Sequence, residues 1–168
     1  MLVTRERRFM SRDTIHIHAV SLSSLTSKRP PIVCGSCKAS TISSPAVWGS
    51  RVVFIRQYKK AAEQTLLVLP WGEIERDETP LAAGRRELEE ETGYSFDTAE
   101  VYGPFYDLPD KSTGGHWVVV ARNTYRKAPP APDEGERISG TEPIPVRELW
   151  QHHIPVLMHV GALRLAGF

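Results

Sequence analysis

The chain has few features of a membrane or disulfide-stabilised protein. It contains two cysteines among 168 residues. It has no apolar run near the roughly 18 residues of a membrane-spanning helix, and it lacks the apolar core of a signal peptide. The formal net charge of +1 gives no basic surface for nucleic acid. We therefore expect a cytoplasmic protein with neither a membrane nor a nucleic-acid partner.

The two cysteines, Cys34 and Cys37, have the spacing of half a zinc ribbon. A structural zinc site needs four ligands, which usually come from two such pairs. The chain has no second cysteine pair and no histidine pair at zinc-finger spacing. Two reduced thiols are therefore the preferred interpretation, and a zinc site within the chain is the alternative.

Charge is unevenly distributed along the chain. Residues 1–45 hold seven Lys or Arg and only two acids, whereas the remainder holds fourteen basic and eighteen acidic residues. A basic start rich in Ser and Thr is typical of an organelle transit peptide. It lacks a clear amphipathic helix, so we prefer an ordinary solvated segment and keep the transit peptide as the alternative.

Hydrophobic periodicity and turn residues predict an α+β domain, and the length suits a single core. In the best-marked helix Thr79 is the N-cap, Pro80 the first residue and Gly93 the residue that ends it. Leu81, Ala82 and Leu88 are expected to face the core. The predicted strands are 14–20, 32–34, 52–58, 65–69, 101–107 and 116–122, the other helices are 146–152 and 156–165, and 127–136 is a Pro-rich acidic loop.

Three glutamates on the first helix conflict with local helix preferences. Glu87, Glu90 and Glu91 share one face and repel one another by roughly 0.2–0.5 kcal/mol per close pair. They also lie near the helix C-terminus, where the helix dipole disfavours anions. Such conflicts tend to mark functional sites, and Mg or Mn would relieve this one because both prefer carboxylate oxygens. For the acidic run alone, a solvated helix face is the alternative.

The spacing of residues 72–94 favours a metal site over a solvated helix face. Gly72, Glu78, Arg86, Glu87, Glu90, Glu91 and Gly93 occupy every fixed position of the Nudix box, Gly-x5-Glu-x7-Arg-Glu-U-x-Glu-Glu-x-Gly-U, with Leu88 and Tyr94 at the two bulky apolar positions U. The chain is thereby identified as a member of the Nudix hydrolase family. The resemblance implies an α/β/α sandwich around a mixed sheet. It also implies Mg- or Mn-dependent cleavage of the diphosphate in a nucleoside diphosphate linked to another group.

The resemblance also implies roles within the box. Glu87 and Glu91 would be metal ligands, Glu90 a ligand or a close neighbour of one, and the Trp71 carbonyl would approach the metal. Arg86 would orient a glutamate, Glu78 would brace Arg86, and Gly72 would allow a tight turn. Relatives usually carry a small residue at the Trp71 position. We interpret its side chain as filling the core beneath the loop, with stacking on an adenine or a sugar as the alternative.

Three features outside the box resemble ADP-ribose pyrophosphatases. Arg56-Gln57-Tyr58 ends a strand before the box, although Lys59 stands where that group carries Arg, and Pro109 lies sixteen residues beyond Gly93. Glu134 and Glu136 lie on a late loop where the group carries a catalytic glutamate. The resemblance implies an ADP-sugar substrate, contacts from Arg56, Gln57 and Pro109, and a general base at Glu134 or Glu136, or otherwise at Glu90.

The alternatives belong to different functional classes. GDP-mannose and other nucleotide-sugars share nearly the same framework, and 8-oxo-dGTP or mRNA-cap hydrolysis is a further possibility. Some Nudix domains sense nucleotides without cleaving them, but their boxes are usually eroded, whereas this one is intact. We expect residues 46–168 to form the Nudix domain. In the resembling group, the segment equivalent to 1–45 builds a small sheet exchanged between subunits, which implies a homodimer.

Overall fold

The computed structural model describes residues 40–106, 109–110 and 114–168. Several predictions lie outside these residues. They are the strands at 14–20 and 32–34, most of the small dimerising sheet, and the state of Cys34 and Cys37.

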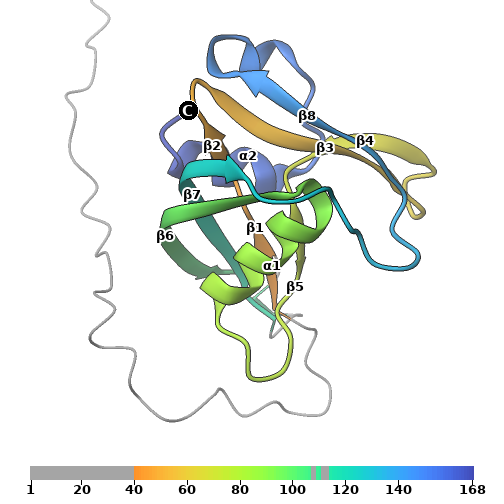
Figure 1. The fold of residues 1–168 in the computed structure, drawn as a ribbon. Helices are drawn as coiled ribbons and strands as arrows, with labels where there is room; N and C mark the ends of the chain where they lie inside the picture. The colour runs from red at the N-terminus through yellow and green to blue at the C-terminus, as the bar shows by residue number, and fades with distance from the viewer. Residues whose placement is uncertain (1–39, 107–108, 111–113) are drawn as a thin grey trace, which may run out of the picture.

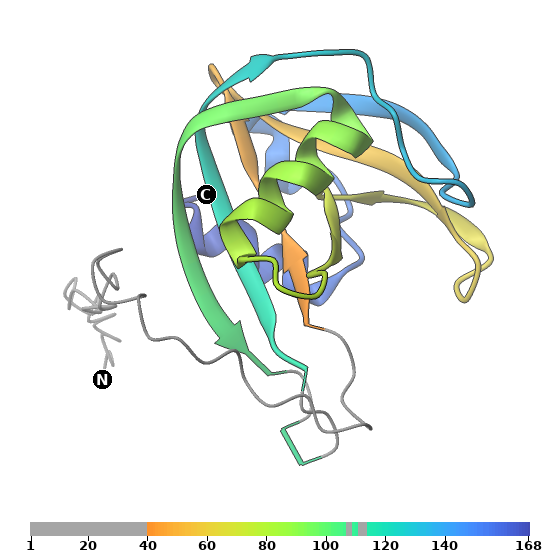
Figure 2. The same cartoon turned by 60° about the horizontal axis from the view of Figure 1, so that its bottom comes forward.

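Within the described residues eight strands form one mixed sheet. A helix lies on each side of it (Figures 1 and 2). Strands β1 and β2 run parallel to β7, and the other pairs are antiparallel. The order is β4-β3-β2-β7-β1-β5, with β6 paired to β7 and β8 paired to β3. In chain order the elements are β1 Thr41–Ser43, β2 Ala46–Trp48, β3 Arg51–Lys59, β4 Gln64–Val68, β5 Trp71–Glu73, α1 Pro80–Thr92, β6 Tyr94–Phe105, β7 His116–Arg126, β8 Ile138–Pro145, the 3-10 helix η2 Val146–Gln151 and α2 Leu157–Leu165.

The sheet divides between β1 and β2, and this division positions α1. Both strands pair with β7 in one continuous register, but β1 carries β5 on its other edge and β2 carries β3. At the division the Ser44 backbone N–H donates to the Pro70 carbonyl (2.8 Å), and its hydroxyl donates to the Gly84 carbonyl of α1 (3.1 Å). The helix is thereby held over the point where β3 and β5 diverge.

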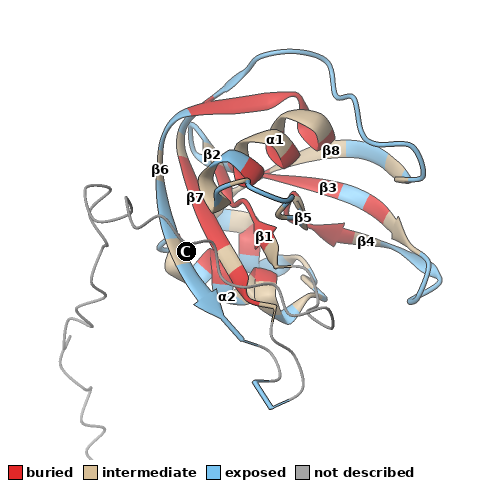
Figure 3. Cartoon of the chain, turned by 90° about the horizontal axis from the view of Figure 1, so that it is seen from below, coloured by how far each residue is buried: buried red, intermediate tan, exposed pale blue. Residues whose placement is uncertain are grey.

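Two hydrophobic cores lie on opposite faces of the sheet, because successive strand residues point to opposite sides. Val53 and Val119 pack with Leu88 of α1, whereas Val52 and Val118 pack with Leu163 of α2. Figure 3 shows these buried strands between the two helices. The predicted α/β/α sandwich around a mixed sheet is confirmed.

Helix α1 forms as its capping residues predict. The Thr79 side chain accepts a hydrogen bond from the Ala82 backbone N–H (3.2 Å), and Gly93 ends the helix with φ +73°. A side chain at Gly93 would also meet the Ala128 carbonyl oxygen at 2.0 Å. The prediction that Ala82 faces the core was wrong: Ala82 is exposed and Ala83, one step around the helix, is buried.

The other elements differ from prediction mainly at their ends. The strand expected at 101–107 begins at Tyr94, directly after the helix, and the helix expected at 146–152 is the 3-10 helix η2. Strand β8 was not predicted, because Gly140, Pro143 and Pro145 are residues atypical of strands. Proline is tolerated there because β8 lies at the sheet edge. No helix in the described part of the chain is long and apolar enough to cross a membrane.

Candidate active site

The Arg86 guanidinium binds three of the box glutamates at once. It donates to both oxygens of Glu78 (3.1 Å each), to Glu87 (2.7 Å) and to Glu90 (3.1 Å), and also to the Glu73 carbonyl (2.9 Å). These contacts, the hydrogen bond with Glu78 first among them, raise the Arg86 pKa above its ordinary value. The structure thus brings Arg86 together with the glutamates that the sequence pattern pairs with it.

Glu91 is the most deeply buried acid of the site. Its side chain is 0% exposed, and one carboxyl oxygen accepts from the Trp71 backbone N–H (2.9 Å). The other, Oε1, is buried without a hydrogen-bond partner among the described residues. Burial raises the Glu91 pKa to about 9, and the charges of Glu136 and Glu87 add to the effect. The nearby charge of Lys59 opposes this shift without outweighing the burial, so the ionised carboxyl group is only partly compensated.

The late loop brings a further carboxylate to this place. Glu136 accepts from the Gln57 side-chain amide (3.2 Å), and its negative charge contributes to the raised pKa of both Glu87 and Glu91. It lies two residues before β8, whose Ile138 pairs with Gln57 next to a register shift in β3. Glu134 is exposed. Of the two loop glutamates, Glu136 is the one that approaches the helix.

The residues predicted to bind substrate do not lie together. Arg56 is exposed on β3 and forms a two-pronged ion pair with Glu142, with distances of 2.6 and 3.3 Å. Gln57, the next residue, is buried and faces Glu136 and Trp71. Pro109 is exposed in a turn whose flanking residues lie outside the described part. The structure therefore brings Gln57 to the glutamates and leaves Arg56 and Pro109 on the surface.

Comparison with known proteins agrees with this geometry. The family model of the NUDIX domain matches residues 41–159.

The chain belongs to the NUDIX family.

Curated relatives share only part of their length with the chain. It is 36% identical over 59 residues to an ADP-ribose pyrophosphatase of Bacillus subtilis (strain 168), a match covering 35% of this chain and 32% of that protein. It is 39% identical over 78 residues to a methanol dehydrogenase activator of Bacillus methanolicus, which covers 46% and 42%. The matched part is thus less than half of each of these relatives. The first match agrees with the predicted resemblance to ADP-ribose pyrophosphatases.

Solved structures resemble the chain in fold. A structure described as an ADP compounds hydrolase superposes with a TM-score of 0.67 at 22% identity, covering 76% of this chain and 70% of that one. A NUDIX hydrolase from Nitrosomonas europaea gives a TM-score of 0.61 at 17% identity, covering 75% and 86%. At these identities the likeness shows the fold alone.

The first glycine of the NUDIX box has a different role from the one expected. The predicted tight turn at Gly72 was wrong, because Gly72 lies within β5, paired with Ile42, and its φ is not in the left-handed region. A Cβ built on Gly72 would lie 2.1 Å from the carboxyl carbon of Glu87. The glycine therefore leaves room for the Glu87 carboxylate against the strand.

Gly72→Ala should accordingly lower activity while leaving the fold intact. The added methyl group meets the flexible end of Glu87, which can move away, so we expect little loss of stability. A displacement of about 1 Å at a reacting group can cost roughly a hundredfold in rate, and we expect a fall in kcat of that order. Steady-state kinetics and a thermal melt would test this, with Gly161→Ala as control because a Cβ there meets no atom within 4 Å. Wild-type turnover in folded Gly72→Ala protein would contradict the packing role.

The acidic groups fit a divalent cation chemically. Within the described residues no group of three or more His, Cys, Asp or Glu is arranged to hold a metal; Arg86 occupies Glu87 and Glu90, and Glu91 faces Trp71. The available donors are all oxygens, the set that Mg and Mn prefer. The unpartnered Glu91 oxygen and the mutual repulsion of Glu87, Glu91 and Glu136 are what a bound cation would relieve.

Three side chains at the site were not predicted as a group. The Lys59 amino group lies 4.4 Å from the centre of the Trp71 ring, and the Trp71 and His159 rings are nearly perpendicular with their centres 5.5 Å apart. Burial lowers the Lys59 pKa, opposed by the charges of Glu91, Glu136 and Glu87. Burial also lowers the His159 pKa, to about 3. The position of Lys59 after Arg56-Gln57-Tyr58 was a usable signal, whereas nothing in the sequence connected His159 with Trp71.

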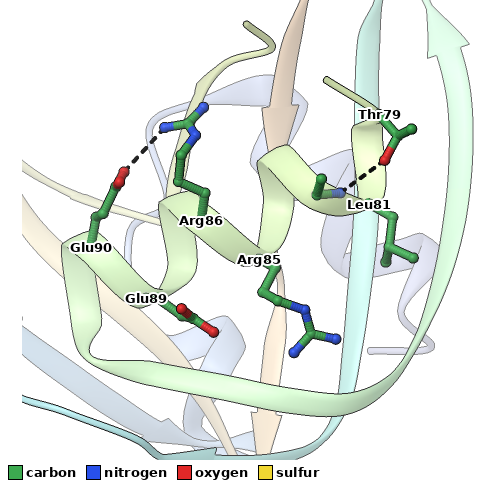
Figure 4. A pocket seen from close by; sticks show the side chains of 7 residues that line it. Thr79, Leu81, Arg85, Arg86, Glu89 and Glu90 are labelled. Carbon is green, nitrogen blue, oxygen red and sulfur yellow. Dashed lines mark hydrogen bonds and ion pairs between the residues drawn. The ribbon is translucent and has the colours of Figure 1, made fainter. Parts of the chain in front are cut away.

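A surface pocket lies along α1 (Figure 4), lined by Thr79, Leu81, Ala82, Arg85, Arg86, Glu89 and Glu90. It shares Arg86 and Glu90 with the glutamate cluster, and its other two charged side chains make hydrogen bonds of their own. Arg85 donates to the Ser95 hydroxyl (2.9 Å) and the Phe96 carbonyl (2.7 Å), and Glu89 accepts from Lys127 (2.7 Å). We therefore place the candidate site at Glu87, Glu91 and Glu136 rather than in this pocket.

Proposed function

We propose that the chain is a metal-dependent hydrolase that cleaves the diphosphate of ADP-ribose or another ADP-sugar, releasing AMP and a sugar phosphate. The observation that supports it best is the hydrogen-bonded connection of Glu136, from a loop far along the chain, through Gln57 and Trp71 to Glu91 of the box. The partial match to an ADP-ribose pyrophosphatase supports this substrate class.

In this proposal Glu87, Glu90 and Glu91, together with the Trp71 carbonyl, would hold Mg or Mn. When bound, such an ion neutralises the diphosphate and lowers the pKa of a coordinated water. Arg86 keeps Glu87 and Glu90 in place through its fork of donors. Glu136 accepts the proton from the attacking water as general base.

The remaining parts of the proposal concern binding and assembly. Arg56 and Pro109 would contact the substrate from the surface, and Gln57 from the inner side. A homodimer assembled through residues 1–45, a cytoplasmic location and a small nucleotide as the partner complete the proposal. A size measurement in solution, with and without residues 1–39, would test the dimer.

A substrate panel is the decisive experiment for the function. Catalytic efficiency would be measured with Mg and with Mn on ADP-ribose, ADP-glucose, GDP-mannose, NADH and dinucleoside polyphosphates, using a phosphatase-coupled assay. We expect an ADP-sugar to be the best substrate. A tenfold preference for GDP-mannose or a nucleoside triphosphate would refute the ADP-sugar assignment. Binding of ADP-ribose without metal-dependent cleavage of any compound would favour a nucleotide-sensing module.

Arg56→Lys should lower kcat/KM for the best substrate by about tenfold. The planar guanidinium can grip two phosphate oxygens at once, which an ammonium group cannot copy. Its present ion pair with Glu142 is exposed and contributes only about 0–1 kcal/mol, so a diphosphate can replace it. Arg51→Lys is the matched control, since Arg51 is another exposed arginine of β3. Equal kcat/KM values for the two variants would show that Arg56 is an ordinary surface arginine.

A further inference from the structure

A line of hydrogen bonds connects the NUDIX box to the late loop through two side chains. The Trp71 indole N–H donates to the Gln57 side-chain oxygen (3.3 Å), and the Gln57 side-chain nitrogen donates to Glu136 (3.2 Å). The three residues come from β5, β3 and the loop that precedes β8. Gln57, the middle residue, is only 4% exposed.

The chemistry of the three groups determines which of them donates and which accepts each hydrogen bond. An indole nitrogen only donates and an ionised carboxylate only accepts, whereas an amide offers an acceptor at one end and donors at the other. Gln57 must therefore turn its oxygen to Trp71 and its nitrogen to Glu136. With this orientation both ends of its amide are engaged by the protein.

Trp71 is itself held from several sides. The Lys59 amino group lies over its ring, the His159 ring packs nearly perpendicular to it, and its backbone N–H donates to Glu91. One residue thus contacts the helix through its main chain and the late loop through its side chain. By contrast, residues 131–135, just before Glu136, are all exposed, so the packing of their own side chains restrains the loop little.

We propose that Trp71 and Gln57 are positioning residues that fix the Glu136 carboxylate relative to Glu91, which the Trp71 backbone N–H holds. The inference rests on the proposed function, in which Glu136 is the general base. It assigns a hydrogen-bonding task to the indole N–H of Trp71. It also gives Gln57 a role in orienting the base, beside the substrate contact proposed above.

The first test separates positioning from general packing. Trp71→Phe keeps an aromatic ring for Lys59 and His159 but removes the indole donor. We expect kcat to fall about three- to tenfold, the range for one lost hydrogen bond, with KM unchanged within about twofold. In a Glu136→Gln background the same substitution should have no further effect on kcat, because the two changes act on one interaction. An equal fall in both backgrounds, or a fall no larger than that in the exposed control Trp48→Phe, would overturn the proposal.

The second test needs no activity. The chain has four tryptophans, and the indole N–H signal missing from Trp71→Phe in a proton–nitrogen NMR spectrum identifies Trp71. In Gln57→Leu this signal should shift and exchange faster with solvent, and in Trp71→Phe the Gln57 amide signals should shift in turn. Unchanged signals in both variants would refute the hydrogen-bonded line. A wild-type protein that cleaves no diphosphate would refute the proposed function, yet these spectra would still decide whether the line exists.

Discussion

Glu91→Gln should lower kcat by roughly a thousandfold while leaving the metal-free protein at least as stable as wild type. The loss follows from removing a charged ligand of the cation, whose stabilisation of the reaction is worth several kcal/mol, with each tenfold corresponding to about 1.4 kcal/mol. Stability should be preserved because burial raises the Glu91 pKa to about 9. At neutral pH the carboxyl group is then largely protonated, and neutral glutamine resembles it. Steady-state kinetics and thermal melts would measure the two effects.

Metal binding provides the control for the Glu91 experiment. Mg at a hundred times its Kd should stabilise the wild type by about 2.7 kcal/mol, which raises the Tm by roughly 5–10 °C for a chain of this size. Glu91→Gln should lose this increase, whereas Glu89→Gln should keep it, because Glu89 on the same helix pairs with Lys127 instead. A normal Mg-dependent increase and near-normal turnover in Glu91→Gln would remove Glu91 from the metal site.

The helix and its charged face were predictable because their signals are local. Thr79 and Gly93 mark the ends of α1, and the i, i+3 and i+4 spacing places Glu87, Glu90 and Glu91 on one face of any regular helix. No tertiary contact is needed for either inference. The family resemblance then supplied the sandwich fold, which the two opposed cores confirm.

What could not be predicted depends on contacts between distant segments. The approach of Glu136 to the helix requires β8 to pair with β3, and neither the Gly- and Pro-containing sequence of β8 nor its register with Gln57 is evident in advance. The role of Gly72 was misjudged for the same reason. A glycine in a motif suggests backbone freedom, but here the missing side chain makes room for Glu87, which approaches from another element.

Glu136→Gln should lower kcat by about a hundredfold to ten-thousandfold, the range for loss of a positioned general base. Glutamine keeps an oxygen that can accept the hydrogen bond from Gln57 but cannot take a proton from water. Substrate binding should therefore change little, which marks a group that acts in the transition state. The matched control is Glu134→Gln, which makes the same chemical change two residues away at an exposed position. Single-turnover rates and substrate affinity of both variants would be compared with wild type.

The pair of loop variants also decides between three locations of the base. A large effect at Glu136 alone agrees with its hydrogen bond to Gln57 and its influence on Glu87 and Glu91. A large effect at Glu134 alone would mean that the loop rearranges when substrate binds, bringing the exposed residue inward. Small, equal effects at both would move the base to the helix, where Glu90 is the remaining candidate, because its ion pair with Arg86 (3.1 Å) already holds it beside Glu87.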